Sequence, residues 1–282
     1  MSRLLIYADN GCDLDEDIID KLGIKLFHMS VILNGNTYKD RVDISPPEFY
    51  QLIAQSDVMP TTAQINPGEF QAEFEKVMNE SEDEIVYIAF SSGLSGTYQS
   101  ACVARDNVNP ERITVIDSKS ASTGYALTVI RAAKAVAAGK SKKEVITEIE
   151  DNINRVQHIF MVGNFEMLKR GGRISSTSAA LGNLLNIKLI LHFVDGKIVP
   201  LEKIHGVKKA KKRMLQIMEE RGYNLQEQLI GIDYSVDYEG ALEIKKMIEN
   251  KFGCREFIIS EIGAVIGSHV GAGTFSIFFL GK

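Results

Sequence analysis

Short apolar runs alternate with helix-compatible segments along the whole sequence, and this alternation constrains the fold more than any other feature. Three runs in the first half, residues 3–8, 85–90 and 113–117, have the composition of strands that are buried on both faces of a parallel sheet. Helical patterns begin near Asp15, Pro46, Pro67, Ser95 and Ser122. Because strands that alternate with helices pack as layers, the sequence predicts an α/β fold.

The second half repeats the alternation and indicates a second domain. A strand over residues 157–162 precedes a hairpin over residues 189–201, and helix–strand pairs follow. A chain of 282 residues is long enough for about two domains. We place the division after the helical stretch Lys142–Arg155, which gives α/β domains over residues 1–160 and 161–282.

Composition and charge exclude several other classes of protein. Apolar residues make up 45% of the chain and charged residues 24%, which argues against disorder and collagen-like repeats. The net charge is −5, so the chain lacks the basic field of a general nucleic-acid-binding protein. The basic run over residues 208–213 fits the solvated face of an amphipathic helix. We therefore expect no nucleic acid among the partners.

Cysteine usage and hydropathy favour a cytoplasmic protein. The cysteines Cys12, Cys102 and Cys254 are widely spaced and form no CxxC pair, so they suit a reducing compartment. The opening residues are typical of a first strand rather than a signal peptide. The uncharged segment over residues 262–281 is long enough to cross a bilayer, but its five glycines favour a buried glycine-rich turn followed by a core strand over residues 274–280.

The strongest local motif is the loop SSGLSGT over residues 91–97, which follows an apolar strand and opens a helix. Ser91, Ser92 and Ser95 supply hydroxyls there, and a small-residue loop before a helix presents unpaired backbone N–H groups. This combination favours a bound phosphate or carboxylate at the carboxyl end of the strand. A tight turn with a serine helix cap explains the same residues without a ligand.

Two other segments carry polar side chains that suit the same ligand. Thr62 lies in PTTAQ, residues 60–64, where its hydroxyl is either solvated in a turn or faces a ligand. His269 lies among glycines in GSHVGAG, residues 267–273, a context that indicates close approach to the backbone. The sequence leaves a structural and a functional role for this histidine open.

Charged residues mark two further loops. Asp9 and Asp13 follow the first strand, but two carboxylates without nearby histidines make a weak metal site, so we predict no metal and expect Asp13 to cap the loop before the next helix. The segment LKRGGRIS, residues 168–175, places Arg170 and Arg173 around two glycines. This basic turn is either solvated or recognises a phosphate or an acidic partner.

Taken together, these motifs resemble the DegV family of fatty-acid-binding proteins over essentially the whole chain. The matching segments are, in chain order, residues 9–13 (DNGCD), 61–64 (TTAQ), 91–98 (SSGLSGTY), 117–118 (DS), 168–174 (LKRGGRI), 185–188 (LNIK) and 262–273. Each motif is short, but their order and spacing are specific.

The resemblance implies two α/β domains with a long-chain fatty acid, such as palmitate, buried between them. It implies that Thr62 and either Ser92 or Ser95 hold the carboxyl group, with Ser91 and His269 in support. Neutral hydroxyls and amides can bind such a group without a buried counter-charge, which limits the cost of desolvation.

The resemblance also implies a partner. Characterised members of the family are non-catalytic, acyl-binding subunits of a fatty acid kinase, and they present the acid to a separate ATP-binding subunit that makes acyl phosphate for lipid metabolism. In this chain, Arg170 and Arg173 would then contact the kinase. No cofactor is implied, and any contact with a membrane would be peripheral or transient.

Two other functions use the same residues. A hydrolase would combine Ser92, His269 and Asp117 as a catalytic triad, although no Gly-x-Ser-x-Gly elbow surrounds Ser92. A phosphosugar-binding module would use the loop over residues 91–97 for a sugar phosphate. The nature of the molecule that copurifies with the protein distinguishes these functions.

Overall fold

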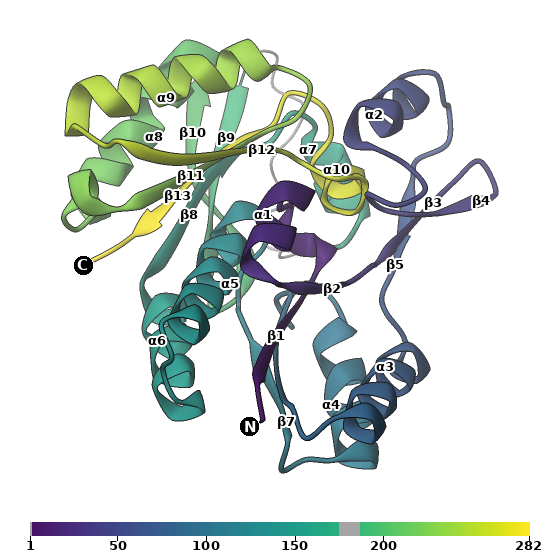
Figure 1. Cartoon of the computed structure of the whole chain (residues 1–282). Coiled ribbons are helices and arrows are strands. Elements are labelled where there is room, and N and C mark those ends of the chain that lie inside the picture. The colour runs from purple at the N-terminus through teal and green to yellow at the C-terminus, as the bar shows by residue number, and fades with distance from the viewer. Residues whose placement is uncertain (1, 175–186) are drawn as a thin grey trace.

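The computed structural model describes residues 2–174 and 187–282, which form three β-sheets with helices packed between and around them (Figure 1). The α/β fold that the alternating pattern predicts is confirmed.

The first sheet is parallel and has the strand order β2-β1-β6-β7. Its strands are β1 (Leu4–Asp9), β2 (Lys25–Phe27), β6 (Glu84–Ala89) and β7 (Ile113–Asp117). The helices of this half are α1 (Glu16–Leu22), α3 (Pro67–Glu80), α4 (Thr97–Val108), α5 (Ser122–Ala137) and α6 (Lys142–Arg155). β6 lies at the centre of the sheet and is buried along almost its whole length, which explains its continuous apolar sequence.

A small antiparallel sheet of order β4-β3-β5 is formed by the chain between β2 and α3. Its strands are β3 (Ser30–Leu33), β4 (Asn36–Lys39) and β5 (Thr61–Ala63), and α2 (Pro46–Ala54) lies between β4 and β5 in the chain. Thr62 pairs with Val31 of β3, so this sheet fixes the position of the threonine that the sequence singles out.

The third sheet has six strands in the order β10-β9-β8-β13-β11-β12, and β11 and β12 are its parallel pair. The strands are β8 (Val156–Met161), β9 (Ile187–Val194), β10 (Lys197–His205), β11 (Leu229–Tyr234), β12 (Glu256–Glu261) and β13 (Phe275–Leu280). Two long helices, α8 (Val207–Arg221) and α9 (Tyr238–Phe252), pack against this sheet, and the short helices are α7 (Phe165–Arg170) and α10 (Ala264–Val270).

Helix α5 connects the two halves of the molecule. It contacts β1 of the parallel sheet and also β8, β11 and β13 of the six-stranded sheet (Figure 1). Because both sides of α5 meet a sheet, most of its residues are buried, and its sequence is rich in alanine.

The structure refines the position of the domain division. The chain passes from the elements around the parallel sheet to the six-stranded sheet between α6 and β8, so a division at residue 160 falls inside β8. The division into two domains itself stays a prediction.

Two sequence interpretations are corrected. Lys211, in the basic run that we expected to be solvated, is buried, and its ammonium group donates hydrogen bonds to the Gly240 carbonyl and the Glu243 carboxylate. The glycine-rich segment before β13 is a helix, α10, rather than a turn. In the part of the chain that the structure describes, no helix combines the length and apolar character needed to cross a membrane.

Candidate functional site

A cavity of about 380 Å³ lies between the carboxyl ends of the parallel strands and one face of the six-stranded sheet. Phe90 and Ala121, which follow β6 and β7, line it from the first sheet, and Phe160 and Phe278 of β8 and β13 line it from the other. Open α/β sheets place ligands at this end of their strands, and the volume is typical of a small-molecule site.

Most of the cavity wall is apolar. On β8 and β13, which are antiparallel neighbours, Phe160 lies opposite Ser276 and His158 lies opposite Phe278, and all four side chains line the cavity. Further apolar lining comes from Phe90, Leu94, Phe193, Ile262, Ile266 and Val270. A wall of this kind suits an alkyl chain, because each buried CH₂ group contributes roughly 0.8 kcal/mol.

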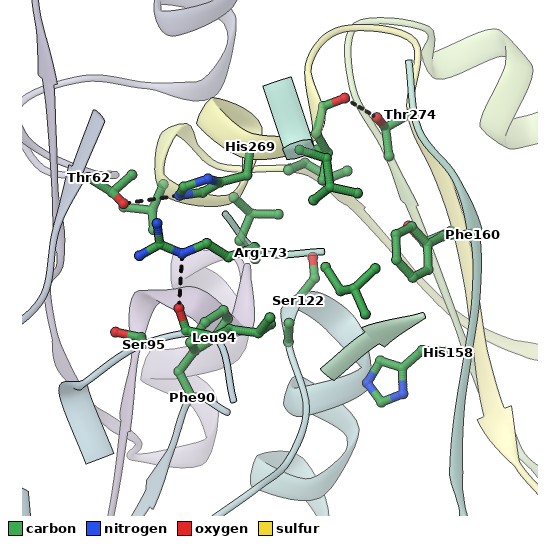
Figure 2. A pocket seen from close by; sticks show the side chains of 18 of the residues that line it. Thr62, Phe90, Leu94, Ser95, Ser122, His158, Phe160, Arg173, His269 and Thr274 are labelled. Atoms are coloured by element: carbon green, nitrogen blue, oxygen red, sulfur yellow. Dashed lines mark hydrogen bonds between the residues drawn. The ribbon is translucent and has the colours of Figure 1, made fainter. Parts of the chain in front are cut away.

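Four polar side chains, those of Thr62, Ser95, Arg173 and His269, lie on one side of the cavity, whereas Ser122, His158 and Thr274 line other parts of it (Figure 2). Thr62 Oγ1 and His269 Nε2 form a hydrogen bond of 3.1 Å, and either atom can donate, depending on the histidine tautomer. Ser95 and Arg173 lie near them and also line the cavity. Arg173 is held in place because its Nε donates to the Leu94 carbonyl over 3.2 Å.

The charges of the side chains around Thr62 and His269 suit the binding of one anion. Burial, with a smaller effect from the positive charge of Arg173, lowers the pKa of His269 to about 4, so the imidazole is neutral at neutral pH. Its Nδ1 is buried and has no hydrogen-bond partner among the described residues. Hydroxyls, a neutral ring and one guanidinium group together match a carboxylate in charge and in hydrogen-bonding capacity.

The three serines of the loop over residues 91–97 occupy different places. Ser95 lines the cavity, and its hydroxyl also accepts a hydrogen bond from the Thr97 backbone N–H at the start of α4. The hydroxyl of Ser91 donates to the Gly196 carbonyl over 2.7 Å, and that of Ser92 donates to the Asp117 carboxylate over 2.5 Å. Ser91 and Ser92 thus tie the loop to its neighbours, and the described cavity lining does not include them.

The catalytic triad that the sequence offered as an alternative is not assembled. Ser92 donates directly to Asp117, whereas His269 bonds to Thr62 through Nε2 and has no described partner at Nδ1. In a triad the histidine lies between the serine and the aspartate and bonds to both, so this geometry does not support a serine hydrolase.

The two arginines of the basic turn also occupy different places. Arg170 is exposed at the end of α7 and its nearest polar contact is the Met59 sulfur at 3.5 Å, whereas Arg173 lines the cavity. Both had been expected to contact a partner. Gly171 lies between them against His269, where an added Cβ would be 2.3 Å from Nδ1. The predicted motifs at residue 175 and at residues 185–186 lie outside the described residues.

Two buried carboxylates hold the helix that carries His269. Asp13 accepts a hydrogen bond from the Gly263 N–H over 2.9 Å, and Asp40 accepts one from the Val265 N–H over 2.9 Å, so both satisfy donors at the start of α10. Asp13 had been expected to cap the loop that follows it. It instead connects the N-terminal half to α10, and within the described ranges no group of three or more histidine, cysteine or acidic side chains is placed to hold a metal ion.

Comparison with known proteins decides the family. A sequence model described as an uncharacterised protein of the DegV family matches residues 3–282. The chain belongs to the DegV family. A DegV domain-containing protein of Caldanaerobacter subterraneus is 36% identical over 279 residues, which cover 99% of each chain. The resemblance seen in the sequence motifs is thereby confirmed.

Solved structures of proteins that are described as fatty-acid-binding share the whole fold. A structure described as showing fatty-acid binding by a DegV family protein from Thermus thermophilus has a TM-score of 0.90 and 31% identity, and covers 99% of this chain and 100% of that one. A protein from Eubacterium ventriosum described as binding stearic acid has a TM-score of 0.89 and 25% identity, with coverage of 100% and 99%.

Sequence reasoning missed several parts of the site. Gln64 lines the cavity, and so do the aromatic side chains of β8 and β13. Arg173 was identified from the sequence, but for contact with a partner rather than for the cavity that it lines. The alternation of β13, in which Ser276 and Phe278 lie on one face, could have identified that wall, because the same face of a strand recurs every second residue. No sequence signal indicates that this face borders a cavity rather than a packed helix.

Proposed function

We propose that this protein binds one long-chain fatty acid, with its alkyl chain in the cavity and its carboxylate at the Thr62–His269 end. The observation that carries the proposal is a mainly apolar cavity with hydroxyls, a neutral imidazole and one guanidinium group at one end. A sixteen-carbon chain would contribute on the order of 10 kcal/mol through burial, before the cost of ordering. Structurally similar proteins that are described as fatty-acid-binding support the assignment.

Thr62, Ser95, His269 and Arg173 are the side chains that we propose for the carboxylate. Ser91 and Ser92 would act indirectly, by holding the loop that carries Ser95. In this arrangement the protein performs no chemistry on its ligand.

Analysis of the ligand tests the binding function. Mass spectrometry of organic extracts from the purified protein should find a saturated or monounsaturated fatty acid, and delipidated protein should bind palmitate in calorimetric titration at one site. Extracts without fatty acid, together with no heat of binding from palmitate, would overturn the proposal.

We further propose that the protein presents the acid to a separate kinase subunit. Arg170 is exposed and next to Gly171, which packs against His269, so a partner that reaches the carboxylate would pass near this arginine. Charges at the rim of an interface act mainly on the rate of association. Arg170→Ala should therefore slow acyl phosphate formation with a cognate kinase and make its rate less sensitive to salt, while palmitate affinity stays close to that of the native protein. Turnover equal to that of the native protein at every salt concentration would exclude this role.

A further inference from the structure

Arg173 carries the one charged side chain in the described lining of the cavity. It lies beside Thr62 and His269 in Figure 2. Its neighbours in the turn, Arg170 and Gly172, are exposed, while Gly171 packs against His269. The proposed carboxylate site therefore lies directly beneath an exposed turn of the chain.

Two backbone carbonyls hold the guanidinium group of Arg173. Nε donates to the Leu94 carbonyl over 3.2 Å, and Nη1 donates to the Gly171 carbonyl over 2.5 Å. An arginine has five N–H groups in one plane, and the other three have no acceptor among the described residues. Arg41 and Arg213 are also partly buried, but each lies within 4 Å of a carboxylate, whereas no described carboxylate pairs with Arg173.

The reaction that we propose for the kinase brings two anions together at this site. A carboxylate oxygen of the bound acid attacks the γ-phosphorus of ATP, which the kinase holds. The bond from that phosphorus to the oxygen of the β-phosphate breaks, and ADP leaves with the electron pair. Because the acid is already ionised, no proton has to move. The approach is opposed by repulsion between the carboxylate and the phosphoryl oxygens. The hydroxyl of Thr62 and the neutral ring of His269 carry no charge that would offset this repulsion.

We infer that Arg173 bridges the carboxylate and the γ-phosphoryl group during this transfer, so that this chain supplies a catalytic residue to the kinase. The inference rests on the proposed function and deepens it. One N–H would bond to a carboxylate oxygen and another to a phosphoryl oxygen, which the planar fork of a guanidinium group permits. Without the kinase, the chain still performs no chemistry on the bound acid. An arginine that a second protein supplies in other phosphoryl transfers raises kcat about 10³–10⁵-fold.

Arg173 suits this role better than its neighbour Arg170. The guanidinium group of Arg170 is exposed and its described contact is the Met59 sulfur, so its charge acts mainly on association. That of Arg173 is fixed by backbone carbonyls before a partner arrives. A charge that is already in place lowers a transition-state barrier without a cost of reorganisation.

Kinetics with fully loaded protein separate catalysis from ligand binding. Palmitate titration gives the Kd of the native protein, Arg173→Ala and Arg173→Lys, and acyl phosphate formation is then measured with each protein saturated with palmitate. Arg173→Ala should lower kcat about a thousandfold, a larger factor than the rise in its Kd. Arg173→Lys keeps the charge but lacks the fork, so its kcat should fall about tenfold or more, the effect of one lost hydrogen bond, with little change in Kd.

Chemical rescue distinguishes a catalytic guanidinium group from a structural one. Guanidinium ion, added to Arg173→Ala far below the concentration that unfolds the protein, should restore part of kcat. Urea at the same concentration has a similar shape but no charge, and should not. Arg105→Ala is the matched control, because Arg105 is a partly buried arginine of α4 outside the described lining, and it should keep the native kcat.

Three outcomes overturn the inference in different ways. If loaded Arg173→Ala has the native kcat, the arginine serves ligand binding alone, and the inference fails while the proposed function stands. A lower kcat that guanidinium ion does not restore would assign Arg173 a structural role and would also end the inference. If the kinase makes no acyl phosphate with the loaded native protein, the proposed presentation of the acid fails together with the inference, while the palmitate titration decides the binding function separately.

Discussion

The hydrogen bond between Thr62 and His269 provides the sharpest test at the scale of single residues. Thr62→Val keeps the shape of the side chain and suits strand β5, but removes the hydroxyl that we propose for the carboxylate. We expect the Kd for palmitate to rise about tenfold, the effect of about 1–1.5 kcal/mol from one hydrogen bond. Thr61→Val, at the exposed neighbour outside the described lining, should bind palmitate as the native protein does. Equal affinity in both variants would exclude Thr62 from the site.

Individual site residues also differ in whether the sequence alone can identify them. Thr62, Ser95 and His269 stand out because polar side chains among small residues are conspicuous, and the structure brings all three to one cavity. Arg173 was expected to contact a kinase partner, since a charge beside two glycines is typical of an exposed basic turn. Its place in the lining depends on the Leu94 carbonyl, which is 79 positions away in the chain and has no sequence signature.

Helix α10 is the element whose packing positions His269. Gly267 lies against α2, where an added Cβ would be 2.7 Å from Tyr50 Oη and 2.9 Å from Phe49 Cε1. Gly267→Ala should therefore push α10 away from α2, lower the free energy of unfolding by about 1–3 kcal/mol and weaken palmitate binding. Gly68→Ala in α3 is the control, because its nearest atom is a side-chain oxygen at 3.2 Å. Thermal unfolding and calorimetric titration of both variants measure the effect, and equal melting temperatures would contradict it.

The glycines in and around α10 also explain why the sequence predicts a turn there. Glycine weakens a helix by its conformational freedom, so a segment with several glycines is not typical of one. Here close packing against α2 and the hydrogen bonds from the start of the helix to Asp13 and Asp40 outweigh that cost. Both contacts come from parts of the chain more than 200 residues away, which a local pattern does not contain.

The contact between Asp13 and α10 should make stability depend on pH. Burial raises the pKa of Asp13 to about 7, although the positive charge of Arg41 opposes the shift. A carboxyl whose pKa is higher in the folded state holds its proton more tightly there, so its contribution to stability is lost as pH rises from about 4 to about 7. Asp13→Asn removes this titration and retains an oxygen acceptor for the Gly263 N–H.

Urea unfolding across this pH range measures the difference. The free energy of unfolding of native protein minus that of Asp13→Asn should fall between about pH 4 and pH 7 and then become constant. Asp15→Asn, which removes an exposed carboxylate 3.6 Å from Arg41, controls for the loss of surface charge. A difference that stays flat or rises through this window would show that Asp13 does not hold its proton in the folded state.

At the scale of the whole molecule, the order of strands and helices could be predicted, but the cavity could not. Alternating apolar runs and helix starts locate most elements to within a few residues, because each pattern is local. The cavity arises where the ends of β6 and β7 meet the inner face of β8 and β13, and its shape depends on how the two large sheets pack. Phe160 and Phe278 look like ordinary core residues in the sequence. Whether such a side chain lines a cavity or packs in a core depends on which residues of other elements lie opposite it.

This position between the sheets leads to a prediction for the molecule as a whole. A ligand in the cavity contacts β5 and the loop after β6 on one side, and α10, β8 and β13 on the other, so unfolding of either half must release it. At a free palmitate concentration of 100 times its Kd, binding should stabilise the native state by about 2.7 kcal/mol. For a chain of this length, the melting temperature should rise by roughly 5 °C, as a single transition. Methyl palmitate has the same chain but no charge for Arg173, so at equal concentration it should give a clearly smaller shift.

Scanning calorimetry of delipidated protein with each compound measures both shifts. Equal shifts would show that the alkyl chain alone determines binding, and a transition that splits in two with palmitate would show that the ligand contacts one half of the molecule.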